Sequence, residues 1–404
     1  MPGPVPRREL VSGASPKESL LWGWLEHASL LDAVLINGVA AAALDYDGLH
    51  MGAVAHTDIV CLPAVLAVAE REHASGQDFL AALVLANETV CRLGSATNLH
   101  SGWFYTSIHG VFGAAAGCAK LLGLDAQGIT HALGIALSQV GGTQQSMVEK
   151  ALTKRVQAAL AGRAGAFSGL MARAGITAPR EAFEGRFGFY NMYEKGDTRP
   201  VLAGLGEQYL CADTSMKKYP SCACNHAVLE ATLQLVDEYD LKPEDCLALK
   251  ATITPYMNRL VGAPYDPGSN PQVAAQFSAQ YSVACAVLRR RLGVAEIQDA
   301  AAMDPALGAF ARRVEIVVDE SNNGELVPAA IEITTRGHGV LRRMVDVLPG
   351  TPQRPLSDAE LAAKVSECLG MGARPLDAAR IVRLRERVAE IDKVTDMAEW
   401  CNGI

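Results

Sequence analysis

The feature that most constrains the fold is a run of helical patterns, rich in Gly and Ala, from about Leu30 to Ala174. One helix is predicted to begin at a cap formed by Asp78. Another is predicted over Val111–Leu122, ending at Gly123, with the next helix starting behind Asp125. Small residues let helix axes approach closely. This half of the chain is therefore predicted to be a helix-on-helix domain.

The pattern changes after about Asp213. A helix is predicted over Ala227–Tyr239, and segments of alternating apolar residues then predict β-strands, with a turn at Gly337–Gly339 between the last two. The predicted strands are Ala248–Pro255, Arg313–Val318, Ala330–Thr335 and Val340–Leu348. Strands mixed with helices in this way favour a small α+β domain.

A linker is predicted at Pro349–Pro355, which contains three prolines and a glycine. Behind it, Ser357 and Glu360 have the spacing of a capping box and predict that the chain ends in helices. The fold class expected is therefore mainly α with an α+β insertion. The predicted boundaries are residues 1–213 for the first part of the helical domain, 214–352 for the α+β domain and 353–404 for the returning helices.

The composition limits the cellular location and the kinds of partner that can be expected for this chain. The chain has 404 residues, of which 50% are hydrophobic and 20% charged, as expected of a globular protein with more than one core. No apolar stretch approaches the roughly 20 residues of a membrane span, and Met1–Leu10 is not followed by the apolar region of a secretory signal. With a net charge of −8 and no basic stripe, a nucleic-acid partner is not expected. We therefore expect a cytoplasmic protein.

The motifs of bound cofactors are missing from the sequence. Gly204-x-Gly206 lacks the third glycine and the preceding strand of a dinucleotide site, and no Walker A motif is present. Cys222, Cys224 and His226 have no second ligand pair at zinc-site spacing, so they are interpreted as buried thiols beside a structural histidine. No metal and no organic cofactor are expected.

Four clusters of polar residues could carry chemistry. Asp45, Asp47, His50 and His56 lie within twelve residues, which suits a histidine made more basic by a carboxylate, or a polar loop between helices. Tyr105 and His109 stand where a Gly/Ala-rich helix begins, so they indicate an anion site at its first turn or an ordinary helix start. The other two clusters are cationic and suit carboxylate binding or a solvated face: Lys154 and Arg155 with Arg163, and Lys217 with Lys218.

Together, these clusters resemble the MmgE/PrpD family, which includes 2-methylcitrate dehydratase, cis-aconitate decarboxylase and iminodisuccinate epimerase. The similarity runs from about Leu35 to the C-terminus, and seven short stretches occur in the family's order. They are Asn37-Gly38 through Asp47; His56 with Leu62-Pro63-Ala64; Gly113–Ala116 with Leu121–Leu124; His131–Ala136; Lys154-Arg155 with Gly162–Ala164; Lys217–Pro220 with Asn225-His226; and Gln276–Ser278 with Gln280-Tyr281.

The resemblance implies a helical domain formed by both ends of the chain, a smaller α+β lid, a homodimer, and an active site in the cleft without metal or cofactor. Asp45 and His56 match the acidic residue and the histidine of the family's first active-site loop. Lys154, Lys217 and Tyr281 match further active-site positions. The separate cations are thus expected to form one pocket for a small polycarboxylate.

The sequence departs from the family pattern in two places. Dehydratase and decarboxylase members have a Phe-His-Pro element before the Gly/Ala helix, and here Phe104 stands at the position of that second catalytic histidine. Tyr105 or His109 is expected to substitute for it. Family members also have about two additional helices before the region that begins near Leu30, so we expect either that the start of the chain is misassigned or that the helical domain lacks part of its start.

The family's shared chemistry removes a proton from carbon α to a carboxylate, with Lys and Arg stabilising the charge that develops. Without the second histidine, the sequence favours an isomerase resembling iminodisuccinate epimerase, which needs proton donors and acceptors on two faces. The alternatives are a dehydratase, a decarboxylase, or an inactive member with a binding or assembly role. The predicted catalytic residues are Asp45, His56, Tyr105, Lys154 and Lys217, and the predicted substrate-binding residues are His109, Arg155, Arg163, Lys218 and Tyr281.

Overall fold

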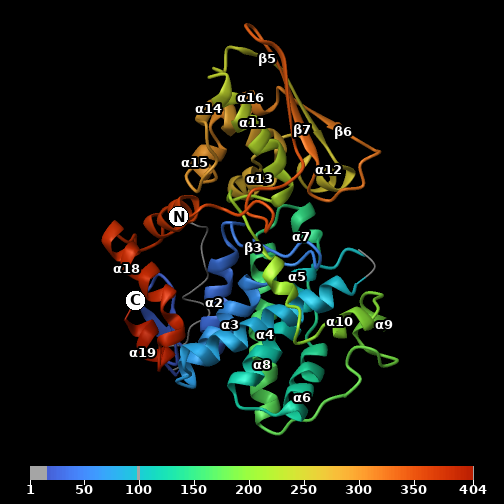
Figure 1. Ribbon diagram of the computed structural model, residues 1–404, viewed down its shortest axis with the longest axis vertical. Coiled ribbons are helices and arrows are strands. Elements are labelled where there is room, and N and C mark those ends of the chain that lie inside the picture. Colours follow the sequence, from blue (N-terminus) through green and yellow to red (C-terminus); the bar gives the residue numbers. More distant parts are fainter. Residues whose placement is uncertain (1–15, 98–100, 404) are drawn as a thin grey trace.

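The structure, a computed structural model, describes residues 16–97 and 101–403. The segment Met1–Leu10, which we expected not to be a secretory signal, lies outside the described residues. The chain is mainly helical with a small mixed sheet, as the sequence predicted. Figure 1 shows a helical body at one end of the molecule and the sheet with its helices at the other.

The helical body packs around two long neighbouring helices, α5 and α8. Its main elements are α2 (Leu30–Ala42), α3 (Asp58–Arg71), α4 (Gly76–Ser95), α5 (Tyr105–Leu121), α6 (Ala126–Leu137) and α8 (Thr153–Arg173). A Cβ atom on Gly165 of α8 would lie 2.5 Å from the Cβ of Ala114 on α5, and one on Gly113 would lie 2.4 Å from a methyl of Val90 on α4. Glycine is therefore required at these crossings, which confirms the close helix packing expected from composition.

Two predicted helix starts were wrong. Ser75, not Asp78, caps α4, since its side-chain oxygen accepts a hydrogen bond from the Asp78 backbone N at 3.1 Å. Helix α5 begins at Tyr105, six residues before the predicted Val111, because Tyr105 and the residues after it are buried against the core. The predicted cap at Asp125 is confirmed by its hydrogen bond from the backbone N of Gly128 at 2.8 Å.

The other end of the molecule has a second apolar core, between a four-stranded sheet and several helices. The strands are β5 (Cys246–Ile253), β6 (Val314–Val318), β7 (Ala329–Thr335) and β8 (Gly339–Val345), and the principal helices are α11 (His226–Glu238), α14 (Ala279–Arg289) and α16 (Pro305–Ala311). In the order β6-β5-β7-β8, only the β5–β6 pair is parallel. All four predicted strands and the β7–β8 turn are confirmed.

The C-terminal segment returns to the helical body. It forms α17 (Asp358–Gly370), α18 (Ala378–Ala389), η3 (Ile391–Lys393) and α19 (Met397–Asn402). The predicted capping box of Ser357 and Glu360 opens α17. Backbone hydrogen bonds from Gly76 N to Val394 O (2.8 Å) and from Met397 N to Ala74 O (2.9 Å) then fix the last turns beside α3 and α4.

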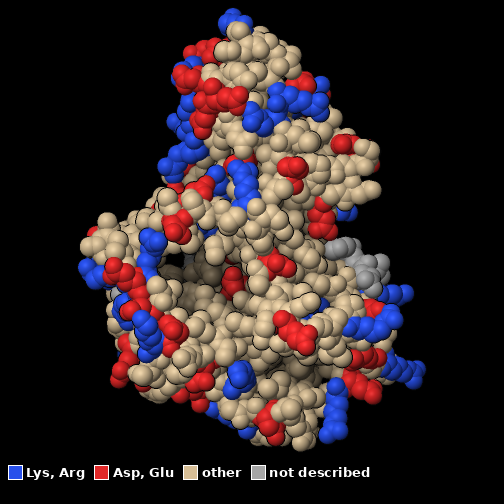
Figure 2. Space-filling view, in the orientation of Figure 1, with Lys and Arg blue, Asp and Glu red and all other residues tan. Residues whose placement is uncertain are grey.

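Shorter elements connect these parts. They are β1 (Ser19–Leu21), β2 (Glu26–Ala28), β3 (Gly48–Leu49), β4 (Ser215–Met216), α7 (Gln145–Val148), α9 (Phe189–Met192), α10 (Arg199–Leu202), η1 (Leu210–Asp213), η2 (Ala223–Asn225), α12 (Pro255–Val261), α13 (Pro271–Gln276) and α15 (Asp299–Ala302). Charges of both signs are interspersed on the face in Figure 2, which is hollowed between the C-terminal helices and the body. Among the described helices, none has both the length and the apolar character needed to span a bilayer.

Candidate active site

The site is built on the loop that follows α2. Asp45 there has a left-handed backbone (φ +50°), which turns the chain sharply after the helix. The loop then forms β3, whose Gly48 and Leu49 pair with Met216 and Ser215 of β4. This short ladder brings the Asp45 loop against the segment of Lys217, about 170 residues later in the chain.

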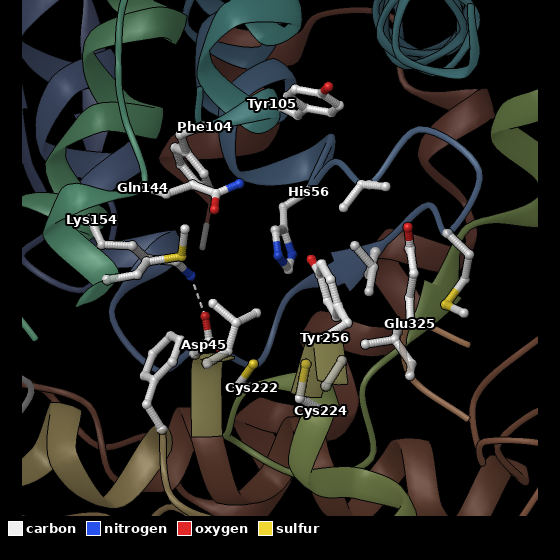
Figure 3. Close-up of a pocket in the computed structure, with 18 of the residues that line it drawn as sticks. Asp45, His56, Phe104, Tyr105, Gln144, Lys154, Cys222, Cys224, Tyr256 and Glu325 are labelled. Atoms are coloured by element: carbon white, nitrogen blue, oxygen red, sulfur yellow. Dashed lines mark hydrogen bonds and ion pairs between the residues drawn. The ribbon is translucent and has the colours of Figure 1, made fainter. Parts of the chain in front are cut away.

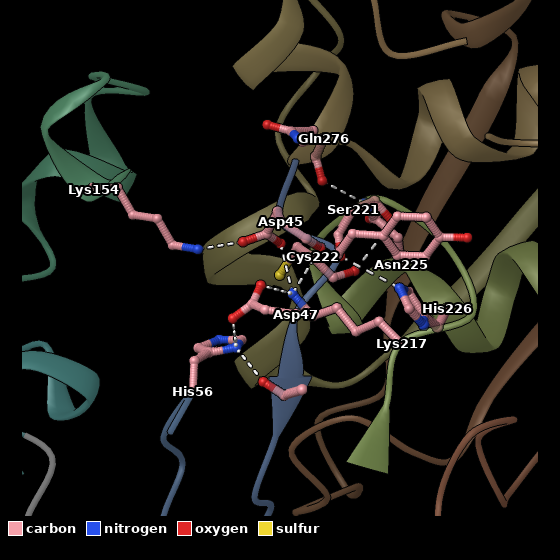
Figure 4. A network of polar contacts seen from close by, with 12 residues as sticks. Asp45, Asp47, His56, Lys154, Lys217, Ser221, Cys222, Asn225, His226 and Gln276 are labelled. Atoms are coloured by element: carbon pink, nitrogen blue, oxygen red, sulfur yellow. Dashed lines mark hydrogen bonds and ion pairs between the residues drawn. The ribbon is translucent and has the colours of Figure 1, made fainter. Parts of the chain in front are cut away.

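Asp45 accepts hydrogen bonds from two lysines that come from different parts of the fold (Figure 4). Lys154, in the first turn of α8, donates to Asp45 Oδ1. Lys217 donates to Asp45 Oδ2 at 2.9 Å and to its backbone O at 3.0 Å. Burial acts to raise the pKa of Asp45, but the two ammonium groups outweigh it and hold the pKa well below its usual range. The pKa of Lys217 is raised, since its attraction to Asp45 and Asp47 exceeds the effect of burial.

His56 is oriented by the same loop. Its Nδ1 is hydrogen-bonded to Gly48 O at 2.9 Å and lies 2.8 Å from Asp47 Oδ2, within ion-pair distance. Its backbone N donates to Thr106 Oγ1 at 3.0 Å. Nδ1 therefore carries the proton, and Nε2 is the ring nitrogen without a protein partner among the described residues.

Asp47 supplies the negative charge behind this imidazole. Neither of its carboxylate oxygens has a well-formed hydrogen bond to another described group, although both are buried. Burial acts to raise the pKa of Asp47, but the attraction of His56 and then of Lys217 lowers it strongly. Asp47 thus lies behind Nδ1 of the imidazole, and Nε2 is the ring nitrogen through which His56 can exchange a proton with a bound group.

Asp45, His56, Lys154 and Lys217 face one cavity of about 80 Å³, shown in Figure 3. At roughly 10–15 Å³ per water it would hold about five to eight waters, which is the size of a small organic acid. Its polar lining comprises Asp45, His56, Tyr105, Gln144, Lys154, Lys217, Cys222, Cys224, Tyr256 and Glu325, and its apolar lining includes Leu49, Met51, Val54, Phe104, Leu260, Phe277 and Leu326. Lys154 and Glu325 lie at opposite ends in this view, with His56 between them.

The structure thus brings together all five residues predicted to be catalytic: Asp45, His56, Tyr105, Lys154 and Lys217 line one cavity. Tyr105 is buried, and burial followed by the Glu194 carboxylate raises its pKa. Its phenol will therefore remain protonated at neutral pH.

The five residues predicted to bind substrate lie outside this cavity. His109 is fully buried between the rings of Tyr105 and Phe189, and burial lowers its pKa to about 3. Arg155 is one layer behind Asp45, where it donates to Gln272 at 2.8 Å and Gln276 at 3.0 Å.

The remaining three are further away. Arg163 is exposed on α8. Lys218 pairs with Glu230 and Glu360 beside α17. Tyr281 is buried in the second core, where its hydroxyl donates to the backbone O of Glu296 at 2.6 Å.

Other residues in the cavity or directly behind it had not been predicted as part of the site. Asp47 had a signal, since it stands two residues after Asp45 in the same polar cluster. Cys222 and Cys224 had been interpreted as buried thiols, and they line the cavity while His226 is buried behind them. A hydrogen bond from Cys224 lowers the pKa of the Cys222 thiol. Tyr256 and Glu325 belong to no motif of the sequence.

Across residues 16–97 and 101–403, no three His, Cys, Asp or Glu side chains are grouped in a way that could hold a metal ion.

Comparison with known proteins gives matches along most of the chain. The MmgE/PrpD N-terminal domain matches residues 7–201 and the MmgE/PrpD C-terminal domain matches residues 219–390. The chain is 28% identical over 393 residues to the cis-aconitate decarboxylase-like protein oryM of Aspergillus oryzae, covering 91% of this chain and 80% of that protein. It is 31% identical over 224 residues to the cis-aconitate decarboxylase of Aspergillus terreus, covering 51% of this chain and 46% of that enzyme.

Proposed function

The chain belongs to the MmgE/PrpD family, and from this premise we propose that it is a lyase that removes a carboxyl group, as carbon dioxide, from a small unsaturated acid. The relatives named above are a cis-aconitate decarboxylase and a cis-aconitate decarboxylase-like protein, which favours a lyase over the isomerase that the sequence had favoured. The observation that carries the proposal is the imidazole of His56, the one histidine among the described residues that line the cavity, beside Lys154.

The reaction requires an electron acceptor and one proton. When the bond to the carboxylate breaks, its electron pair stays on the organic fragment, so the substrate must have a C=C or C=O group placed to accept the pair. The imidazolium of His56 then gives its Nε2 proton to carbon, and neutral imidazole takes up another proton from solvent. The sum is one carboxylate and one proton consumed, with carbon dioxide and a neutral product formed.

Lys154 is suited to stabilise the group that accepts the electron pair. Its Nζ lies 6.0 Å from the centre of the Phe104 ring and 5.8 Å from that of Phe277, and one of its protons is donated to Asp45. A cation fixed in this way requires little rearrangement as negative charge develops beside it. Lys217 is bound to Asp45 and close to Asp47, so its proposed role is to hold those carboxylates in position.

The dehydratase and epimerase alternatives each need a second proton-transfer group. For dehydration this group would be an acid for the departing hydroxyl, but His109 is buried away from the cavity and the raised pKa of Tyr105 makes its phenol a weaker acid. For epimerisation it would be a base on the other face of the substrate, but the raised pKa of Tyr105 opposes that role. Decarboxylation needs only one proton donor, and among the described residues His56 is the one histidine that lines the cavity.

The proposal is tested by a screen for carbon dioxide release. The purified protein is incubated with small acids that carry a C=C or C=O group β to a carboxylate, and products are identified by NMR in D₂O. We expect release from at least one acid, with one deuterium incorporated into the product. His56→Ala should abolish release, whereas His73→Ala, at an exposed histidine that pairs with Asp396 and does not line the cavity, should not. Proton exchange at carbon without carbon dioxide release would favour the epimerase instead.

The domain division, the oligomeric state and the cellular location of the protein are part of the same proposal. Two separate apolar cores support a division into a helical domain of residues 1–213 and 353–404 and an α+β domain of residues 214–352. We also propose, from the family resemblance, that the enzyme is a cytoplasmic homodimer that acts on a small molecule without a bound cofactor.

A further inference from the structure

The wall of the cavity carries two thiols that contact each other. Cys222 and Cys224 both line the cavity, and the Cys222 sulfur accepts a hydrogen bond from the Cys224 side chain. Figure 3 shows the two sulfur atoms side by side on one wall, with His56 above them in this view. The reaction proposed above uses neither thiol.

The local backbone explains why both thiols point the same way. Ala223 begins η2, so the Cα atoms of the two cysteines on either side of it lie about 5 Å apart. Side chains two residues apart within a helix point to nearly opposite sides. Cys222 precedes the helix, however, and its extended ψ of 133° turns its side chain back to the side of Cys224. The Cα separation is within the range of about 4.4–6.8 Å that a disulfide requires.

Cys222 is also the more acidic thiol. The hydrogen bond from Cys224 lowers its pKa most, and the ammonium group of Lys217 acts in the same direction, against the effect of burial. All ten cysteines lie in the part of the chain that the structure describes, and the pKa of each of the other nine is raised. Because the thiolate is the reactive form of cysteine, Cys222 is expected to react before the others.

A small oxidant can reach this thiol through the cavity. Hydrogen peroxide is close to water in size, and a cavity of about 80 Å³ has room for several waters. Cys222 is half-buried, whereas Cys224 is 1% exposed. An oxidant in the cavity therefore meets Cys222 first, with a second thiol in contact with it. A reactive thiol beside a resolving thiol is the arrangement found in cysteine redox sensors.

From these observations we propose that Cys222 and Cys224 form a peroxide-reactive site, in which Cys222 is oxidised and Cys224 converts the product into a disulfide. The Cys222 thiolate attacks one oxygen of hydrogen peroxide, the O–O bond breaks and hydroxide leaves, which gives a sulfenic acid. The Cys224 sulfur then attacks the sulfur of that acid, and the S–O bond breaks with loss of water. In sum, two thiols and one peroxide give one disulfide and two waters. This site goes beyond the proposed function and does not depend on it.

The disulfide should change the cavity beside Lys217. Its S–S bond is about 2.05 Å long, so the Cys222 side chain must turn toward Cys224. The backbone of this turn is held, because Gln276 O accepts hydrogen bonds from Cys222 N at 3.0 Å and from Asn225 Nδ2 at 2.9 Å. The movement therefore falls on the Cys222 side chain, whose sulfur leaves its place near the Lys217 ammonium group. We expect oxidation to lower carbon dioxide release severalfold and dithiothreitol to restore it.

Peptide mapping of the whole protein tests the site. The protein is treated with hydrogen peroxide, the remaining thiols are blocked with N-ethylmaleimide, and trypsin with Glu-C then releases residues 219–230, which contain these two cysteines and no other. We expect this peptide to lose two hydrogens and to carry no N-ethylmaleimide, at peroxide doses that leave Cys368 unmodified. Oxidation of another cysteine before this pair, or accumulation of a sulfenic acid in place of the disulfide, would overturn the proposal.

Two variants assign the roles of the thiols. Cys224→Ser removes the resolving thiol, so Cys222 should accumulate as a sulfenic acid that dimedone traps. Cys368→Ser, at a half-buried thiol of α17 that does not line the cavity, should leave the yield of disulfide unchanged. Absence of a dimedone adduct on Cys222 in Cys224→Ser would refute the order of the two steps.

The mass measurement does not depend on which reaction the enzyme catalyses, so the two proposals can fail separately. Formation of the disulfide in a protein that releases carbon dioxide from no acid would refute the lyase function and support the thiol site. Formation of the disulfide without any change in carbon dioxide release would refute the effect of oxidation on the cavity. Release of carbon dioxide from a protein that forms no disulfide would support the lyase function and refute the thiol site.

Discussion

Replacing Lys217 by Met should destabilise the protein strongly, since it removes a buried positive charge from between two buried carboxylates. The Lys217 side chain is 3% exposed, and its Nζ makes two hydrogen bonds to Asp45 and lies 3.8 Å from Asp47 Oδ1. Methionine is a good volume match, so packing should change little. Breaking a buried pair typically costs about 3–5 kcal/mol. Because Asp45 keeps Lys154 and Asp47 keeps His56, we expect about 3 kcal/mol, at the lower end of that range.

The free energy of unfolding that is lost in Lys217→Met should depend on pH. In the unaltered protein the pKa values of Asp45 and Asp47 are lowered, so these groups contribute stability above their unfolded pKa values, and this is lost as the pH falls through the lower folded values. Without Lys217 the folded pKa values rise. The difference in free energy of unfolding between the two proteins should therefore be largest near neutral pH and narrow as the pH falls below about 4, the unfolded pKa of Asp.

Urea unfolding followed by tryptophan fluorescence measures this difference. Lys218→Met is the matched control, because that side chain is 26% exposed and a pair with this exposure contributes at most about 1 kcal/mol. Adding Asp45→Asn to Lys217→Met should restore part of the lost stability, since it removes the excess negative charge that Lys217→Met leaves in the cluster. A cost below about 1 kcal/mol for Lys217→Met, or no recovery in the double variant, would refute the reasoning.

Three further predictions concern other parts of the molecule. Burial raises the pKa of Glu70 from 4.5 to about 7, so its contribution to stability is fully present below pH 4.5 and is lost as the pH rises through 7. At 1.36 kcal/mol per pH unit, Glu70→Gln should be more stable than the parent by up to about 3 kcal/mol above pH 7 and equal to it near pH 4, as measured by denaturation at both pH values. Iodoacetamide should alkylate Cys222 before Cys224 and inhibit carbon dioxide release, because Cys222 lines the cavity and its pKa is lowered; peptide mass mapping that finds Cys224 modified first would contradict this. Light scattering should give the mass of a dimer at micromolar concentration, and a monomer there would refute the proposed assembly.

The sequence predicted the strands and the convergence of Lys154 and Lys217 on Asp45. It predicted less well which other residues surround the cavity. Strand alternation is a local pattern, and the three charged residues lie in stretches that resemble the family. His109 had been predicted to bind substrate, but it lies outside the cavity. Because α5 begins at Tyr105, His109 stands within the helix, and packing against Phe189, some 80 residues later, sets the direction of its imidazole.

Other parts of the site depend on helix geometry and on distant contacts. Arg163 follows Arg155 by eight residues, and at about 100° per residue these side chains point roughly 80° apart. Arg155 therefore reaches the layer behind Asp45, whereas Arg163 is exposed. Glu325 enters the cavity from the loop before β7. No short-range pattern marks such a residue, because only the folded sheet brings that loop opposite Lys154.

The charge balance of the cavity also bears on the choice between reactions. Removing a proton α to a carboxylate turns a monoanion into a dianion, and stabilising that state requires positive charge beyond what the ground state uses. Lys154 and Lys217 are both bound to Asp45, so among the described residues of the cavity their positive charge is already engaged in the ground state. Loss of carbon dioxide does not increase the negative charge of the substrate, and transfer of the His56 proton then removes that charge. Two lysines already bound to Asp45, with His56 as the one histidine among the described lining residues, therefore favour decarboxylation over epimerisation through a state of higher negative charge.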